Sequence, residues 1–288
     1  MPNRKHQRGV TLIEMMIAMV VSLVLVAGVG TVYFSSKRSY QVRDELSQMN
    51  EAGRAALETL RKHLEHAGYA TPSKLPLGAY FFVNGDPNLA VQSCGGGKQN
   101  IKDPNDFNAR STRDAFNANG DAISVRFLGD NNLFLDAAGG ALPDECRVGN
   151  AAGMDASLIY NAFHVDNDGS TRDANNRLVP ILYALGSNVN NRQPVVNGIE
   201  NIQFQYGIDT DGNGTADRFV NATNVGAANW ESVVSIKVAI LVRSLGDVLE
   251  ANSVRTYNLL DATVTTPSDR YQRAVYTTTI QLRNVVDN

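Results

Sequence analysis

The chain has too few basic residues for a typical nucleic-acid-binding protein and too few cysteines for a disulfide-rich scaffold. It contains 26 Lys and Arg residues against 29 Asp and Glu residues, which gives a formal net charge of −3 and a pI of 5.8. This balance argues against a basic surface for nucleic acid. Two cysteines permit one disulfide at most. The length of 288 residues permits one large domain or two ordinary ones.

Charge is missing altogether from one long segment. Charged residues make up 19% of the chain, and none lies in residues 15–36, a run of 22 mostly apolar positions. A helix of roughly 20 residues spans the hydrocarbon core of a bilayer. The mean hydropathy of −0.21 excludes a polytopic membrane protein, so the sequence predicts a single membrane span. A cleaved secretory signal fits less well, because its apolar core is about 7–15 residues long and ends at a small-residue site.

The residues in front of this run add information. Arg4, Lys5 and Arg8 precede it and predict a cytoplasmic amino end by the positive-inside rule. Gly9 follows them, and Glu14 stands at the start of the apolar span. A carboxylate in lipid costs on the order of 2.5–3.5 kcal/mol at the centre of a helix and less near its end. An acid at this place therefore indicates a functional partner.

A basic leader, a glycine, an acid five residues later and an apolar helix together resemble the class III leader of type IV pilins. The resemblance implies cleavage between Gly9 and Val10 by the prepilin peptidase and N-methylation of the new amino-terminal Val10. It also implies that Glu14 pairs, in the filament, with the amino terminus of a neighbouring subunit. Two groups that are each costly in lipid then compensate one another at one axial register. An ordinary signal anchor is the alternative.

The apolar span continues into a charged but still helical segment. Apolar residues recur every three or four positions from Leu46 to Leu64, which is the stripe of a helix with one buried face. Gly68 suits the C′ position. One helix is therefore expected from about residue 10 to residue 67.

Two pairs of residues in this helix have two interpretations each. Gly28 and Gly30 would either weaken the helix locally or let neighbouring helices pack closely. His63 and His66 are three residues apart. They would form either a metal-binding pair or, as the simpler interpretation, two solvated side chains.

After Pro72 the pattern changes from helix to strand. Residues 72–120 are expected to be irregular, because Pro, Gly, Asn and Asp recur in them. Alternating polar and apolar residues then predict half-buried strands that are joined by loops, which favours an antiparallel sheet. A long helix followed by such a sheet is an α+β fold with long loops. The strands are expected at residues 123–127, 199–206, 234–242 and 275–282.

The order of segments in the second half adds a further resemblance. Residues 197–206 are followed by an acidic loop, then Trp230 precedes a strand at residues 233–243, and the chain closes on Leu282-Arg283-Asn284. This order resembles the PilW-type minor pilins and, more loosely, the J-type pseudopilins of type II secretion.

The resemblance implies a pilin-like fold in which the first half of the helix packs with other subunits and the second half packs on the sheet. Four segments are then expected. They are a cleaved leader at residues 1–9, a membrane or filament-core helix at 10–36, its amphipathic continuation at 37–68 and an extracytoplasmic β-rich head at 69–288.

Cys94 and Cys146 enclose 51 residues within this expected head. Outside the cytoplasm such a pair is expected to form a disulfide. Two free thiols are the alternative, and a catalytic pair is disfavoured because the chain has no C-x-x-C motif.

Residues 209–217 have the oxygen spacing of a calcium loop. Calcium takes six to eight oxygen ligands from a loop that curls around it. Gly214 stands at the sharp turn, but Val220 replaces the glutamate of EF-hand position 12 and no helices flank the loop, which excludes an EF-hand domain. The expected donors are Asp209, Asp211, Asn213, the Thr215 carbonyl and Asp217, at EF-hand positions 1, 3, 5, 7 and 9.

A solvated Asp/Asn/Gly turn is the alternative for this loop. A weaker copy of the pattern, without the turn glycine, occurs earlier in the chain. Its expected donors are Asp166, Asp168, Ser170 and Asp173.

These features favour a structural protein over an enzyme. A membrane-tethered periplasmic enzyme is not supported, because the chain has no Ser-His-Asp order, histidine-rich metal site or nucleotide-binding fingerprint. The resemblance implies a minor pilin that helps to initiate or cap a type IV pilus and presents partners at its tip, for motility, adhesion or DNA uptake. A J-type pseudopilin is the alternative.

The resemblance also implies partners and a location. The expected partners are other minor and major pilins, the prepilin peptidase, the inner-membrane assembly platform and a tip adhesin, with no direct nucleic-acid binding. Before assembly the chain would cross the inner membrane once, with a cytoplasmic amino terminus and a periplasmic head. After assembly it would belong to an extracellular pilus.

Overall fold

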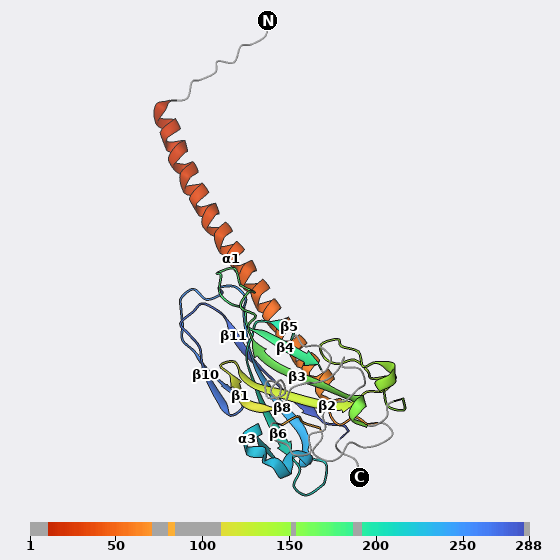
Figure 1. The fold of residues 1–288 in the computed structure, drawn as a ribbon. Coiled ribbons are helices and arrows are strands. Elements are labelled where there is room, and N and C mark those ends of the chain that lie inside the picture. Colours follow the sequence, from red (N-terminus) through yellow and green to blue (C-terminus); the bar gives the residue numbers. More distant parts are fainter. Residues whose placement is uncertain (1–10, 71–79, 84–110, 151–153, 187–191, 285–288) are drawn as a thin grey trace. The chain divides into compact units, whose positions relative to one another are not determined.

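The computed structural model describes residues 11–70, 80–83, 111–150, 154–186 and 192–284. The chain divides into two compact units between Leu46 and Ser47. The first unit holds the amino-terminal part of a long helix, and the second holds the end of that helix together with the β-sheet (Figure 1).

The predicted long helix is α1 (Leu12–Leu64), which has 53 residues. It runs without a break through Gly28 and Gly30, and open space surrounds both glycines. The Thr31 hydroxyl donates a hydrogen bond of 2.8 Å to the Gly28 carbonyl. Local weakening at these glycines is therefore not seen, and close packing by a neighbouring helix stays a prediction.

The helix ends three residues earlier than expected, at a turn that requires glycine. Gly68 has a φ of +75°, the left-handed conformation that suits glycine at C′. A Cβ on Gly68 would lie 2.2 Å from the Tyr80 ring. The Gly68 amide donates to the Arg126 carbonyl of the sheet, so the chain leaves the helix directly onto a strand.

The two parts of α1 have different surroundings. From Leu12 to Phe34 in the first unit the large apolar side chains are exposed, from 52% at Val21 to 78% at Leu12. Among the described residues, α1 is the one helix long and apolar enough to cross a membrane, by length and composition. In the second unit the predicted stripe is buried at Met49, Gly53, Ala56, Leu60 and Leu64.

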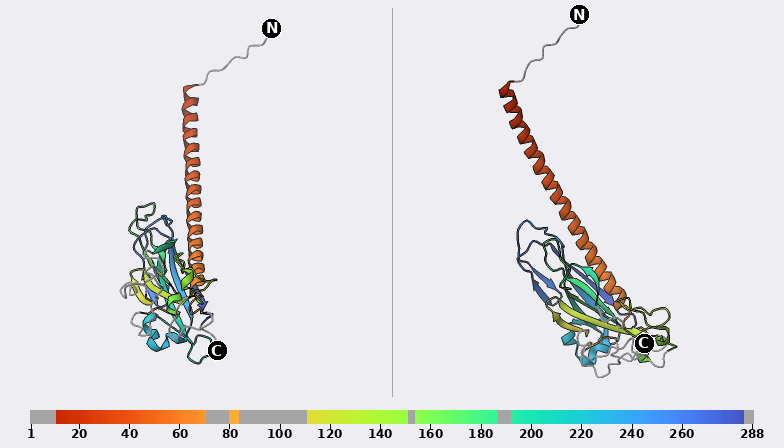
Figure 2. Two further views of the ribbon diagram at one scale, coloured as in Figure 1. Left: turned by 45° about the vertical axis from the view of Figure 1, so that its right-hand side comes forward. Right: turned by 45° about the horizontal axis from the view of Figure 1, so that its top comes forward.

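Residues 47–64 of α1 lie along a nine-stranded sheet (Figures 1 and 2). The strand order is β11-β8-β6-β2-β3-β4-β5, with β1 paired to β2 and β7 paired to β6. A separate two-stranded sheet is made by β9 and β10. The bounds are β1 (Arg113–Asn117), β2 (Gly120–Leu128), β3 (Leu158–Asp166), β4 (Ile181–Gly186), β5 (Gln193–Asn197), β6 (Ile199–Ile208), β7 (Arg218–Val220), β8 (Val233–Arg243), β9 (Thr256–Leu259), β10 (Ala262–Thr265) and β11 (Arg273–Gln281).

Short helical turns connect several of these strands. They are the 3₁₀ turns η1 (Asp144–Cys146), η2 (Met154–Ser157) and η3 (Ala227–Ser232), and the single helical turn α3 (Ala222–Val225). The side-chain oxygen of Asn221 accepts a hydrogen bond from the Asn224 amide and caps α3.

The expected antiparallel sheet is confirmed with one exception. All strand pairs of the large sheet are antiparallel except β2 and β6, which pair in parallel at Gly120 and Ile202. The four predicted strands correspond to β2, β6, β8 and β11 within three residues at each end. The expectation that residues 72–120 are irregular was wrong at β1, which folds back on β2; residues 71–79 and 84–110 lie outside the described part.

Aromatic side chains fill the core of the head. Trp230 packs against Tyr206 and Phe81, with ring centroids 4.9 and 5.1 Å away. Every residue of β2 is buried. This strand is therefore covered on both faces, although it contains the polar residues Asp121, Ser124 and Arg126.

Candidate functional site

The first turn of α1 places Glu14 in a reciprocal pair with Thr11. The Thr11 amide and hydroxyl donate to Oε2 of Glu14, at 2.8 and 2.9 Å, and the Glu14 amide donates to the Thr11 hydroxyl oxygen at 3.3 Å. This arrangement is a capping box, in which two residues satisfy amides that the start of a helix leaves without partners. The leader residues Gly9 and Val10 lie outside the described residues.

The capping box leaves part of the carboxylate available. Both hydrogen bonds from Thr11 go to Oε2, and Oε1 has no hydrogen-bond partner among the described residues. The surrounding helix surface is apolar and exposed, so it needs lipid or other helices to cover it. A carboxylate held in one orientation on such a surface can pair with a cationic group of another molecule.

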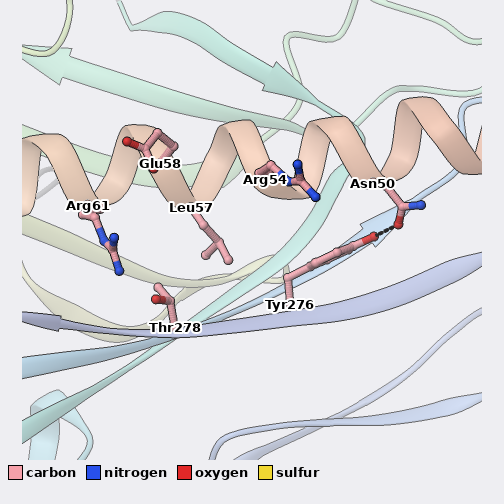
Figure 3. Close-up of a pocket in the computed structure, with 7 residues that line it drawn as sticks. All are labelled: Asn50, Arg54, Leu57, Glu58, Arg61, Tyr276 and Thr278. Carbon is pink, nitrogen blue, oxygen red and sulfur yellow. Dashed lines mark hydrogen bonds between the residues drawn. The ribbon is translucent and has the colours of Figure 1, made fainter.

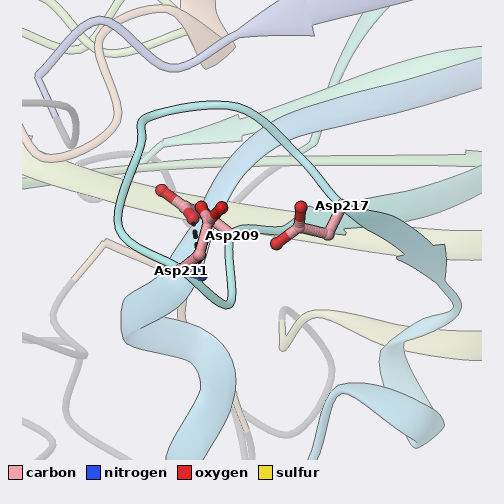
Figure 4. Close-up of side chains that lie close together, drawn as sticks. All are labelled: Asp209, Asp211 and Asp217. Atoms are coloured by element: carbon pink, nitrogen blue, oxygen red, sulfur yellow. Dashed lines mark hydrogen bonds between the residues drawn. The ribbon is translucent and has the colours of Figure 1, made fainter.

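The predicted calcium loop connects β6 to β7. One carboxylate oxygen from each of Asp209, Asp211 and Asp217 lies within 4.8 Å of the others (Figure 4). Asp209 accepts from the amides of Gly212 and Gly214, both at 2.7 Å. The loop therefore folds around the Asp209 side chain. Gly214 has a φ of +80°, which confirms the predicted sharp turn.

The other side chains of this loop also bind within it. The Asn213 side-chain amide donates to Asp211 at 3.0 Å, and the Asn213 side-chain oxygen accepts from the Thr215 amide at 2.8 Å. The Thr210 amide donates to Asp217 at 2.8 Å. Among the described residues, no Lys or Arg forms an ion pair with the three carboxylates. The donors are hard oxygens, the type that calcium prefers.

Hydrogen bonds lower the pKa values of Asp209 and Asp217. Burial raises the pKa of Asp209, but the amides of Gly214 and Gly212 lower it by more, so the pKa lies below its ordinary value. The Thr210 hydroxyl and amide lower the pKa of Asp217. Both groups are thus charged at neutral pH, as a calcium ligand must be. Calcium binding itself stays a prediction.

The second acidic loop does not bring its carboxylates together. Asp166 is bound by the guanidinium of Arg192. Asp168 accepts from the amides of Ser170 and Thr171, at 2.8 and 2.6 Å. Asp173 is bound by the Tyr271 hydroxyl and lies 3.8 Å from a guanidinium nitrogen of Arg243. Three separate sets of partners hold these groups, and within the described ranges they form no cluster of acids.

Two family models match the chain. The model described as Type IV Pilus-assembly protein W matches residues 162–284, which run from within β3 to the last described residue. The model described as the Prokaryotic N-terminal methylation motif matches residues 4–30. The chain is a type IV pilin-like protein with a PilW domain.

The comparison with solved structures found a type IV-like pilin from Thermus thermophilus. It is 14% identical, the match covers 86% of this chain and 100% of that one, and the TM-score is 0.37. No protein with curated annotation matches this PilW-like pilin.

The acidic loop and both of its flanking strands belong to the PilW domain, whereas Glu14 belongs to the methylation motif. Thr11 is the residue of this pilin that sequence reasoning missed. The pattern Thr-x-x-Glu before an apolar run is the sequence signature of a capping box, and it was present at residues 11–14.

The structure describes one of the two cysteines of the predicted disulfide, Cys146. Cys146 is fully buried, in a cluster with Phe127, Leu142 and Ile159. Cys94 lies outside the described residues, so the pairing stays a prediction.

The solvated interpretation of His63 and His66 was wrong. Both are partly buried against the sheet, where the His63 ring lies 5.8 Å from Phe163 and the His66 ring 5.7 Å from Phe127. Burial, then the charges of His66 and Lys62, lower the pKa of His63 to about 4. His63 is therefore neutral at pH 7. In the described part of the chain, neither histidine belongs to a group of three metal-ligating residues.

Proposed function

We propose that this PilW-like pilin is a minor subunit of a type IV pilus, which helps to initiate or cap the filament and to present partners at its tip. Its role is assembly rather than turnover. The observation that carries the proposal is Glu14, a capped carboxylate with one free oxygen at the start of an exposed, otherwise uncharged helical surface.

The apolar part of α1 would hold the subunit in the inner membrane before assembly, with the amino terminus in the cytoplasm and the head in the periplasm. The prepilin peptidase would cleave after Gly9 and N-methylate Val10. The helix would then pass from lipid into the filament core through the inner-membrane assembly platform. Both environments cover the same exposed side chains with apolar groups, so the transfer leaves no large area of helix in water.

Within the filament, the Glu14 carboxylate would pair with the amino group of Val10 on a neighbouring pilin. The pair favours one axial register, because a shift by any other distance leaves both charges uncompensated in a medium of low dielectric constant. The capping box supports this role, since it fixes the orientation of the carboxylate before the partner arrives.

The test is the identity of the amino terminus in purified filaments. Tagged full-length chain is made in its host, filaments are sheared and purified, and the amino terminus of the tagged protein is sequenced by mass spectrometry. We expect a methylated Val10 in the filament fraction. The variant Gly9→Leu serves as the control and should keep its leader and remain in the membrane fraction.

An intact leader in the filament fraction, or a cut after the apolar span, would refute the proposal. A deletion strain then separates pilus from pseudopilus. We expect loss of pili or of twitching with normal protein secretion. Loss of secretion with normal pili would instead identify a J-type pseudopilin.

A further inference from the structure

The two edges of the large sheet differ in how well they are protected. The strand β5 forms one edge; it has five residues, contains Pro194 and pairs irregularly with β4. The strand β11 forms the other edge and has nine residues in an unbroken register with β8. Short strands, prolines and bulges are the usual means by which proteins block an edge, and β11 has none of them.

The pairing of β11 shows which of its backbone groups face outward. The Arg243 amide donates to Gly198 on the β6 side of β8, and the Leu282 amide donates to Val234 of β8. Backbone groups alternate in direction along an antiparallel strand. Even-numbered residues of β11 therefore bind β8, whereas the amides and carbonyls of Val275, Thr277 and Thr279 point to the open side.

These outward groups lack backbone partners among the described residues, and β11 carries no charged side chain next to them. The one charged residue of β11 is Arg273, which binds Glu200 and Asp269 at the start of the strand. The rest of β11, Ala-Val-Tyr-Thr-Thr-Thr-Ile-Gln, is uncharged and rich in residues that favour strands. A long, uncharged and open edge is a template for another strand.

A groove runs beside this edge, between α1 and β11 (Figure 3). Its volume is about 560 Å³, and Tyr276 closes one end by a hydrogen bond to Asn50. Arg54 and Arg61 of α1 line it and are exposed. Within the described residues neither arginine forms an ion pair. Glu58, which is also exposed, lies between them on α1, so the groove places two cations and one carboxylate beside an open strand edge.

We propose that the free edge of β11 accepts an extended, acidic segment of a neighbouring pilin by β-strand addition. The outward amides and carbonyls of Val275, Thr277 and Thr279 bind its backbone, and Arg54 and Arg61 bind its carboxylates. This inference rests on the proposed function, because it names the contact by which the head is held next to another subunit.

Charge decides against a second copy of the same edge as the occupant. Residues 274–281 contain no acid, so a β11 strand from another copy offers nothing to Arg54 and Arg61. On the groove side of β11, Thr278 is a short side chain between Tyr276 and Ile280, and the groove beside it has room for acidic side chains of the added strand. The partner is therefore a different pilin with an acidic, extended segment.

The test is site-specific photo-crosslinking of the full chain in its host. The photoreactive residue p-benzoylphenylalanine replaces Thr279, and crosslinked peptides are identified by mass spectrometry. We expect one crosslinked segment from another pilin, with acidic residues in it. Thr277→Pro in the same chain removes one outward amide and leaves every bond to β8 intact. It should reduce the crosslink by at least about tenfold, since a lost hydrogen bond and a steric block act together.

Two further variants guard against a folding defect. Thr277→Val keeps the amide and should crosslink as the parent does. The double variant Arg54→Glu/Arg61→Glu changes exposed groups and should also weaken the crosslink. No crosslink at position 279, a crosslink to a second copy of this chain, or equal yields with and without Thr277→Pro would each overturn the inference.

A second probe separates this inference from the proposed function. The same photoreactive residue at Leu25, which is 64% exposed on the apolar part of α1, reports packing with other pilins in the filament. Crosslinks from Leu25 without crosslinks from position 279 would refute the strand addition and leave the pilin role standing. Absence of both would refute both.

Discussion

Replacing Glu14 by glutamine separates two roles of this residue, the helix cap that it forms with Thr11 and the proposed charge pair with a neighbouring subunit. The Glu14 side chain accepts hydrogen bonds from the amide and the hydroxyl of Thr11. A glutamine carbonyl accepts the same bonds, because glutamine serves at this position of a capping box as glutamate does. The variant Glu14→Gln therefore keeps the local cap and removes only the negative charge.

The loss of the Glu14 charge should raise the free energy of the subunit only in the filament, where the neighbouring amino group would lack its partner. A neighbouring amino group left without its carboxylate would remain as an uncompensated ion in an apolar medium. Such an ion costs on the order of 2.5–3.5 kcal/mol at the centre of a bilayer and less near its edge. Even the reduced cost corresponds to a loss of about tenfold or more in incorporation.

The variant Thr11→Ala tests the other role. It removes the cap, which costs about 0.5–2 kcal/mol of helix stability, but it keeps the Glu14 charge. We expect it to enter filaments better than Glu14→Gln does. The assay is the ratio of tagged full chain in sheared filaments to that in membranes, with the amino terminus sequenced to confirm cleavage. If Glu14→Gln enters filaments normally while Thr11→Ala fails, the carboxylate acts as a cap and the proposed pairing is wrong.

Three more predictions follow from the head. Leu60→Ala removes a fully buried side chain and should lower the free energy of unfolding by about 2–5 kcal/mol, measured by urea denaturation of the full chain in detergent. The pKa of His63 is about 4 in the fold and 6.5 in the unfolded reference, so the unfolded state binds more protons between these values. The contribution of neutral His63 to the free energy of unfolding is fully present above pH 6.5 and is lost as the pH falls toward 4. The loss should be about 1–2 kcal/mol, because the side chain is partly exposed. Calcium titrated into the full chain should release or absorb heat and raise the Tm, and Asp209→Asn should abolish both effects.

Each of these predictions has a matched control. Glu51→Ala changes an exposed position of α1 and should alter stability by less than about 0.5 kcal/mol. Burial raises the pKa of Asp121 to about 6. This shift increases the free energy of unfolding as the pH falls, whereas the shift of His63 decreases it over the same pH range. The informative quantity for His63 is therefore the difference between the parent and His63→Phe. A constant difference from pH 7 to pH 4 would contradict a neutral, buried His63.

For calcium, Asp168→Asn is the control, because its carboxylate lies in the loop that holds no acid cluster. It should leave the titration unchanged. A titration without heat and without a thermal shift would discard the calcium prediction.

Local sequence patterns were enough to predict α1. An uncharged run and a stripe at helical spacing are both carried by neighbouring residues, so each could be read directly. The burial of His63 and His66 was also accessible, because His63 stands three residues after the buried Leu60 and one before the buried Leu64. Residues beside the centre of a stripe border the packed face rather than the solvent.

The strands β3 and β4 were not predicted from the local sequence pattern. In β3, eight of the nine residues are buried, so the alternation that reveals a half-buried strand is absent. The parallel pairing of Gly120 with Ile202 could not be predicted either, since it joins segments far apart in the chain.

The two acidic loops show what limits the prediction of a site. Both have aspartates at alternate positions. In sequence, the feature that distinguishes the first loop as the better calcium candidate is its turn glycine, Gly214. In the loop at 209–217, every hydrogen bond to an aspartate carboxylate comes from a residue at most seven positions away. In the other loop, Asp166 is bound by a residue 26 positions away and Asp173 by one 98 positions away. A spacing motif thus predicts a cation site only where the loop itself supplies the groups that orient its carboxylates, because distant arginines and tyrosines otherwise occupy them first.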